Sequence, residues 1–256
     1  MNRYALVAIV SIAAALAGCS GKSAPEEKPA SPSSKVVHVD PATAGSISGT
    51  VSFKGTVPKA ASIDMSADPA CKGQNASEEF VVHDGKLGNV LVYVKNTSGL
   101  AVAAPQGDIV VKQEGCRYVP HVIALMAGGT VKFVNTDDTM HNIHPMPHEN
   151  KEWNAAQMSH AEPLEKKFTK PELMIPVKCN QHPWMKMYVN VADSPFFAVT
   201  GPDGKFDIKG LPPGVYTVAA VHESMGAQEQ QITVGPREDK KLGFTFEREK
   251  GAAAAK

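Results

Sequence analysis

The sequence predicts an all-β protein. From Ser46 onward, short apolar or alternating runs are separated by Gly, Pro, Asn and Asp, which is typical of strands joined by turns. Few segments are long enough for an amphipathic helix. Runs of this spacing indicate β-sandwiches or barrels. The twelve predicted strands are SISGTVSF, NVLVYVK, DIVVKQ, HVIAL, TVKFVN, ELMIPVK, KMYVNVA, FFAVT, KFDIKG, VYTVAAV, QITV and GFTFE.

The first residues predict an exported protein. Arg3 precedes an apolar run over residues 4–16, which is too short to span a bilayer. The stretch LAGC that ends at Cys19 resembles a bacterial lipoprotein signal. This resemblance implies that residues 1–18 are removed and that lipid is attached to Cys19. An ordinary secretory signal and a retained apolar helix are the alternatives. Because Ser20 is not Asp, the sorting rule of such lipoproteins favours the outer membrane over the inner one.

The rest of the chain divides into four parts. Residues 19–45 are rich in Ser, Pro, Ala and Lys, which predicts a flexible tether. Residues 46–96 and 195–249 together resemble a transthyretin-like, carboxypeptidase regulatory-like sandwich, on GSISGTVSFKG and FAVTGPDGKFDIKGLPPGVYTVAAV. Residues 97–194 are expected to form a second sandwich inserted in the first, with a tandem or one merged sandwich as alternatives. Residues 250–256 predict a tail.

The charge of the chain gives no sign of a nucleic-acid partner. Lys and Arg number 26, Asp and Glu also number 26, and the formal net charge is zero. A nucleic-acid-binding domain would show a basic surplus. The sequence also has no phosphate loop of the GxxxxGK[ST] type.

Cysteine usage separates one thiol from the rest. Of the four cysteines, Cys19 is assigned to lipid, which leaves three. In an oxidising compartment an even pair is expected to form a disulfide. Cys71 and Cys116 lie in the turn-like settings ADPACKG and QEGCRY, which predicts a bond between them. Cys179 is then the odd thiol, and it lies beside His182 in CNQHPWM.

The loop CNQHPWM and an upstream histidine predict a copper site. Cys179, His182 and Met185 lie between two predicted strands, and His141 is predicted to lie at the end of another strand, TVKFVN with the residues after it. Two imidazoles, one thiolate and one weak thioether are the donors of blue copper. The loop matches the Cys-x-x-His-Pro-aromatic-Met ligand loop of amicyanin, and residues 108–193 resemble a cupredoxin of the plastocyanin and amicyanin kind. The resemblance implies a Greek-key β-sandwich, one type 1 copper ion and one-electron transfer between redox partners in the cell envelope, rather than an enzyme.

The resemblance also assigns residue roles. The implied ligands are His141, Cys179 and His182 in the equatorial plane and Met185 as the axial ligand. Met187 stands where a longer loop would place its methionine, so it is the alternative axial ligand. His144, in HNIHPMPH, is the alternative first histidine.

Three neighbours of the ligands are expected to support the site. Asn142 matches the residue that ties the first-ligand loop to the cysteine loop in cupredoxins. Gln181 stands where amicyanin has proline, so it keeps an N–H that is expected to point at the Cys179 sulfur and raise the reduction potential. Trp184 is expected to shield the metal.

Three other functions remain open at the level of sequence. Cys179 with a histidine base would make a hydrolase. Further methionines near the site would suit a lipoprotein that binds and delivers copper as cargo. The transthyretin-like sandwich would suit a binding or scaffolding module with a structural copper.

Overall fold

The computed structural model describes residues 37–73, 75–97, 100–101 and 107–248. The predicted signal, the predicted lipid site at Cys19 and the predicted tail lie outside these residues. All of these described residues belong to one compact unit. The described residues contain strands and their connections without any helix, so none of them includes a helix able to cross a membrane. The predicted all-β class is confirmed.

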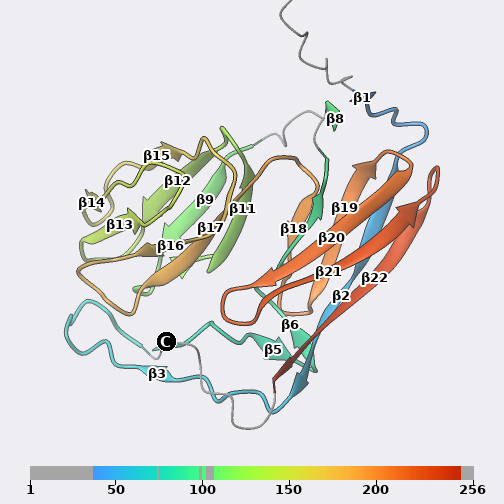
Figure 1. Ribbon diagram of the computed structural model, residues 1–256. Coiled ribbons are helices and arrows are strands. Elements are labelled where there is room, and N and C mark those ends of the chain that lie inside the picture. Colours follow the sequence, from blue (N-terminus) through green and yellow to red (C-terminus); the bar gives the residue numbers. More distant parts are fainter. Residues whose placement is uncertain (1–36, 74, 98–99, 102–106, 249–256) are drawn as a thin grey trace, which may run out of the picture. The chain divides into compact units, whose positions relative to one another are not determined.

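Two sheets form the sandwich that carries the predicted ligands, called the donor sandwich below (Figure 1). The first sheet has the order β10-β9-β12-β15, with bounds Tyr118–Val119, Ile109–Gln113, Thr130–Asn135 and Leu164–Lys167. The second has the order β11-β17-β16-β13-β14, with bounds Val122–Met126, Lys186–Ala192, Glu172–Lys178, His141–Pro145 and Ala155–Gln157. Parallel pairs β9–β12 and β11–β17 occur beside antiparallel pairs such as β16–β17.

Two further sheets form a second sandwich, called the flanking sandwich below. One has the order β18-β7-β20-β21, with bounds Phe197–Val199, Leu91–Lys95, Gly214–His222 and Gly226–Val234. The other has the order β19-β2-β6-β5 with β22 also paired to β2, and its bounds are Lys205–Leu211, Gly45–Gly55, Lys86–Leu87, Val82–His83 and Asp239–Arg248. Two short pairs complete the described strands: β1 (Val37–His38) with β8 (Leu100–Ala101), and β3 (Ser62–Ile63) with β4 (Asn75–Ala76).

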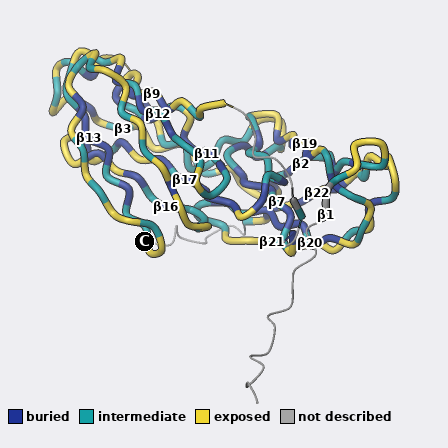
Figure 2. The backbone as a smooth tube through the Cα atoms, turned by 90° about the horizontal axis from the view of Figure 1, so that it is seen from above, coloured by how far each residue is buried: buried dark blue, intermediate teal, exposed yellow. Residues whose placement is uncertain are grey.

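Alternating side chains give each sandwich its own apolar core. Because successive strand residues point to opposite faces, β22 buries Leu242, Phe244 and Phe246 and exposes the residues between them (Figure 2). These side chains join the core of the flanking sandwich. The core of the donor sandwich is separate and includes Phe133 and Ile143. The period-two pattern of the sequence therefore accounts for both cores.

Strand β2, near the start of the described chain, pairs with strands near its end. It pairs antiparallel with β19 and parallel with β22, so that Gly49 lies opposite Phe206 on one side and Leu242 on the other. A strand near residue 50 thus shares a sheet with strands beyond residue 200, which is the pairing that an inserted arrangement requires. The boundaries of the inserted domain, residues 97–194, stay a prediction.

The last part of the predicted tether is ordered, which corrects that expectation. Residues 37–45 include strand β1 and a turn in which the Asp40 carboxylate accepts a hydrogen bond from the N–H of Ala42, at 2.9 Å. Val39 packs against the core of the flanking sandwich. An apolar side chain and a local turn therefore fix the chain here, despite the polar composition of the segment.

Residues 62–73 and 75–78, called the capping segment below, pack against the donor sandwich. Ile63, Met65 and Cys71 contact its core, although the sequence assigned residues 46–96 to the other sandwich. The predicted disulfide between Cys71 and Cys116 is present and joins the capping segment to the donor sandwich. Closing a loop of this length by a disulfide stabilises the fold by about 4 kcal/mol in the chain-entropy treatment.

A buried ion pair connects the two sandwiches. His121 Nε2 lies 2.6 Å from the Glu223 carboxylate, and the two side chains are 3% and 2% exposed. Lys186 Nζ lies 3.3 Å from the second oxygen of the same carboxylate. Burial would raise the pKa of Glu223, but His121 and Lys186 lower it. The carboxylate thus stays ionised although it is buried.

We expect Gly49→Ala to destabilise the protein strongly. A Cβ at Gly49 would lie 1.6 Å from the backbone oxygen of Leu242, so strands β2 and β22 would have to separate. Overpacking of this kind costs about 1–3 kcal/mol. The matched control is Gly243→Ala, where the nearest atom lies 3.8 Å away, and it should leave the free energy of unfolding within about 0.5 kcal/mol. Urea unfolding of both variants tests this, and equal stability would mean that β2 and β22 do not pair.

Candidate metal centre

The loop between β16 and β17 carries three of the predicted ligands. The two strands pair antiparallel with Lys178 opposite Lys186, so Cys179 and Met185 close the loop from its two ends. The Cys179 N–H donates to the Met185 carbonyl at 3.2 Å, and the Met185 N–H donates to the His182 carbonyl at 2.9 Å. The tight turn therefore places the thiol, imidazole and thioether at one end of the donor sandwich.

His141 comes from a neighbouring strand. It is the first residue of β13, whereas the sequence placed it at the end of the preceding strand. That strand, β12, ends at Asn135, and the Asn135 side chain holds the connection by donating to the Thr139 carbonyl at 2.9 Å and accepting the Asp137 N–H at 3.0 Å. Strand β13 then pairs with β16, next to the cysteine loop.

Three donor atoms converge inside this end of the sandwich. The Nδ1 atoms of His141 and His182 lie 2.8 Å apart, and the Cys179 sulfur lies 3.7 Å from His182 Nδ1. All three donor atoms lie within 4.8 Å of one another. His141, Cys179 and His182 are 0%, 2% and 3% exposed, and Met185 is 1% exposed. Imidazole and thiolate donors in a buried, compact group suit copper.

Asn142 connects the loop of His141 to the loop of Cys179 by hydrogen bonds. Its side-chain oxygen accepts the N–H of Asn180 at 2.7 Å, and its backbone N–H lies 3.5 Å from the Cys179 sulfur as a donor. Its side-chain amide donates to Asn154 at 2.7 Å. The Tyr118 hydroxyl donates to the Asn142 carbonyl at 2.5 Å. Loop spacing and sulfur orientation are thus fixed by a buried network.

The expected role of Gln181 is corrected. Its N–H donates to the side-chain oxygen of Asn142 at 3.3 Å, because the turn directs it away from the sulfur. The backbone N–H that reaches the sulfur is that of Asn142.

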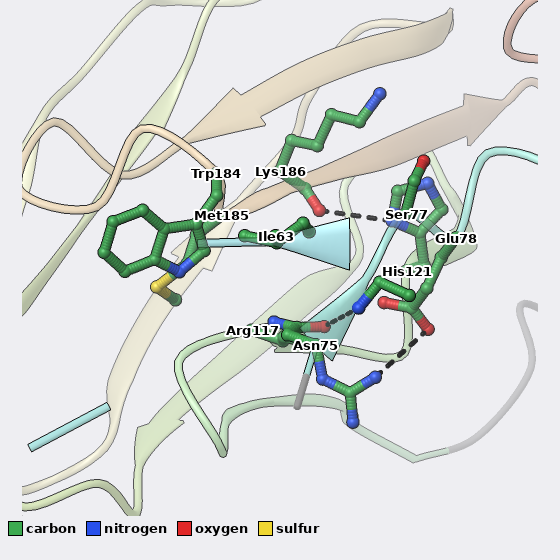
Figure 3. Close-up of a pocket in the computed structure, with 10 residues that line it drawn as sticks. Ile63, Asn75, Ser77, Glu78, Arg117, His121, Trp184, Met185 and Lys186 are labelled. Atoms are coloured by element: carbon green, nitrogen blue, oxygen red, sulfur yellow. Dashed lines mark hydrogen bonds and ion pairs between the residues drawn. The ribbon is translucent and has the colours of Figure 1, made fainter. Parts of the chain in front are cut away.

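Trp184 covers the ring of His182. The two rings lie 5.1 Å apart between centroids, and the indole N–H donates to the Cys116 carbonyl at 3.2 Å. A cavity of about 50 Å³ lies next to Trp184 and Met185. In Figure 3 the ion pair of Arg117 with Glu78 lies on the other side of this cavity, at 3.9 Å. Trp184 is itself only partly buried, so the indole covers the His182 ring and also lines this small cavity.

Two carboxylates contact the predicted ligands, and the sequence did not single them out. Asp137 lies 2.9 Å from His141 Nε2, and Asp68 of the capping segment lies 2.9 Å from His182 Nε2. Hydrogen bonds from the Ala70 N–H, Thr139 and His182 lower the pKa of Asp68 to about 2. For Asp137 the sequence holds one weak signal of a contact with His141, namely its position four residues earlier. Asp68 has none, because nothing in the sequence links the disulfide to the predicted ligands.

The electrostatics of the group favour a thiolate beside an imidazolium. Burial opposes a charge on His141, but hydrogen bonds and charges from Asp137 and Cys179 outweigh it and raise the pKa of His141 to about 9. Burial likewise opposes a charge on Cys179, but His141 and the N–H groups of Asn142 and His182 lower its pKa to about 7.

The second-choice ligands lie in different places. His144 is outside the converging group, and its two ring nitrogens contact Asn180 at 3.2 Å and Glu152 at 2.7 Å. Met187 is fully buried in the core of the donor sandwich, in β17 opposite Val177. The choice of Met185 over Met187 as the axial ligand stays a prediction.

Comparisons with known proteins give partial likenesses. No protein-family model and no curated protein matches the chain. Among solved structures, the Cu-containing nitrite reductase of Thermus scotoductus is 25% identical with a TM-score of 0.33, and the match covers 37% of this chain but only 24% of the reductase. A purple cupredoxin from Nitrosopumilus maritimus (22% identical, TM-score 0.29) is matched over 33% of this chain and 100% of its own. Amicyanin from Paracoccus versutus (24%, TM-score 0.31) is matched over 40% and 97%.

Cupric affinity should depend on pH. Between pH about 7 and 9 the metal must displace one proton from His141, so affinity should rise about tenfold per pH unit and level off above about 9. Below about 7 the slope should steepen, because Cys179 is then protonated too. Chelator competition across pH 5.5–10, on the order of half-unit steps, measures this. His160→Gln, which changes an exposed histidine paired with Asp138, is the control. A flat affinity from 7 to 9 would show that His141 is a neutral imidazole over this range and has no second proton to lose.

Proposed function

We propose that this protein is a one-electron carrier with a type 1 copper centre held by His141, Cys179 and His182, with Met185 as the axial ligand. The observation that supports it best is the convergence of the two Nδ1 atoms and the sulfur within 4.8 Å, at positions no more than 3% exposed. Copper bound to such donors supplies a centre that alternates between cupric and cuprous states.

The protein's own residues limit how far this centre can change shape. Asn142 fixes the spacing of the two ligand loops, and carboxylates fix both imidazole rings. Trp184 and the capping segment exclude water from one side. Rigid donors keep the reorganisation on electron transfer small, which is what a carrier requires.

Burial of the donors weighs against two other functions. A hydrolase would have to bring substrate to the Cys179 sulfur, but this residue is 2% exposed. A copper-delivery protein would exchange ligands with a partner at accessible donors, but His141 and His182 are buried. The carrier fits this geometry better than either alternative.

We also propose that the carrier works at the cell envelope. The disulfide Cys71–Cys116 suits an oxidising compartment. The lipoprotein-like stretch before Cys19 suits attachment by lipid, with the outer membrane favoured, and electron partners would be redox proteins of the envelope. Globomycin-sensitive processing and palmitate labelling that depend on Cys19 would support this.

The purified protein loaded with cupric ion should show an intense thiolate-to-copper absorption in the visible range and a narrow copper hyperfine splitting. Cys179→Ser should lose both, because it removes the thiolate. Absorption and electron paramagnetic resonance of the two proteins measure this. A colourless wild-type protein, or a copper signal that survives the substitution, would contradict the carrier and favour copper delivery or a structural role.

The axial ligand can be assigned by a matched pair of substitutions. Met185→Leu should raise the reduction potential and change the absorption ratio of the copper bands, because it removes a weak donor. Met187→Leu should change neither, because it replaces one apolar side chain by another in the same core. The reverse result would assign Met187 as the ligand.

A further inference from the structure

Both predicted histidine ligands donate their outer N–H to a carboxylate. His141 Nε2 lies 2.9 Å from Asp137, and His182 Nε2 lies 2.9 Å from Asp68. A proton fixed on Nε2 leaves Nδ1 free to bind a metal. The two Nδ1 atoms do face each other, at 2.8 Å. The carboxylates thus determine which nitrogen of each ring faces the donor group.

Asp68 is held in place from two sides. One oxygen accepts the Ala70 N–H at 2.8 Å, and the other accepts the Thr139 hydroxyl at 2.8 Å as well as the His182 N–H. Thr139 lies two residues before His141. Asp68 therefore connects the capping segment to both ligand loops, although it is 114 residues from His182 in sequence.

Asp137 is held by the backbone around the disulfide. It accepts the N–H of Gly115 at 2.7 Å and of Cys116 at 2.8 Å. Cys116 is bonded to Cys71, whose N–H donates to the carbonyl of Asp68 at 3.0 Å. One disulfide thus joins the loops that carry the two carboxylates.

We propose that Asp68 and Asp137 are positioning residues that hold both imidazoles for copper and lower the reduction potential of the centre. The inference rests on the proposed function. A carboxylate that accepts the outer N–H makes an imidazole more basic. The more basic ligand, and the negative charge itself, stabilise cupric over cuprous copper. Asp68 and Asp137, one for each histidine, would therefore both shift the equilibrium between the two oxidation states toward cupric copper.

The central experiment compares Asp68→Asn, Asp137→Asn and the double variant with the wild-type copper protein. Asparagine keeps the size and an accepting oxygen but removes the charge. Cupric affinity should fall about 10- to 100-fold, with a smaller loss for cuprous copper. Each tenfold preferential loss raises the potential by about 59 mV. The matched control is Asp138→Asn, whose carboxylate pairs with the exposed His160 and should leave the potential unchanged.

A second substitution is expected to shift the reduction potential in the opposite direction. Thr139→Val removes a hydroxyl that donates to Asp68 and leaves the carboxylate in place. Asp68 then becomes the stronger acceptor for His182, so the potential should fall. A general disturbance of the site would shift Thr139→Val and Asp68→Asn in the same direction, and that result would overturn the proposal. Unchanged potentials in both Asn variants would overturn it too.

Nitrogen NMR of the metal-free protein tests the carboxylates without relying on copper. His141 and His182 should each carry a proton on Nε2. Asp137→Asn should shift the Nε2–H resonance of His141 upfield, and Asp68→Asn should do the same for His182. A histidine without a proton on Nε2 would overturn the proposal. If the wild type lacks the thiolate-to-copper absorption but passes this test, the carrier function fails while the positioning of the rings stands.

Discussion

The side-chain amide of Asn142 sets the distance between the two loops that supply the donors. Its oxygen accepts N–H groups of the cysteine loop, at Asn180 and Gln181, while the backbone N–H of the same residue donates to the Cys179 sulfur. His141 is the adjacent residue, so one short side chain relates the first imidazole to the thiol. Because Asn142 is itself held by Asn154 and Tyr118, hydrogen bonds within the protein fix the positions of the donors. The carboxylates, the indole and the capping segment all act on a group that this amide has assembled.

Keeping charge in an apolar core is the second constraint. A thiolate and an imidazolium removed from water each cost several kcal/mol unless they are paired and hydrogen-bonded. Here Cys179, His141 and Asp137 form a chain of alternating charge, and backbone N–H groups satisfy its ends. Truncating any member leaves another unpaired. The site therefore belongs to the stability of the donor sandwich as well as to its chemistry.

The predictable part of the structure is the part encoded by local spacing. Period-two patterns located the strands, and the loop CNQHPWM showed three neighbouring donors at once. Contacts between distant segments left no such trace. Asp68 meets His182 across 114 residues and His121 meets Glu223 across 102, and no periodicity links either pair. The prediction that the Gln181 N–H points at the Cys179 sulfur is wrong for a related reason. The direction of one N–H depends on the conformation of the whole turn, and residue identity alone does not specify it.

Strand β2 has a consequence for the order in which the protein is made. Its parallel partner is β22, and the residues joined at its start, Ser46 and Asp239, are 193 positions apart. Synthesis runs from the N-terminus, so β2 appears first and receives its partner last. All strands of the donor sandwich lie between them and are complete earlier. During synthesis, a finished donor sandwich would therefore coexist with an unpaired strand edge, the feature most prone to intermolecular pairing. The donor sandwich is thus complete before the flanking sandwich, and the ten residues of β22 pair with β2 last.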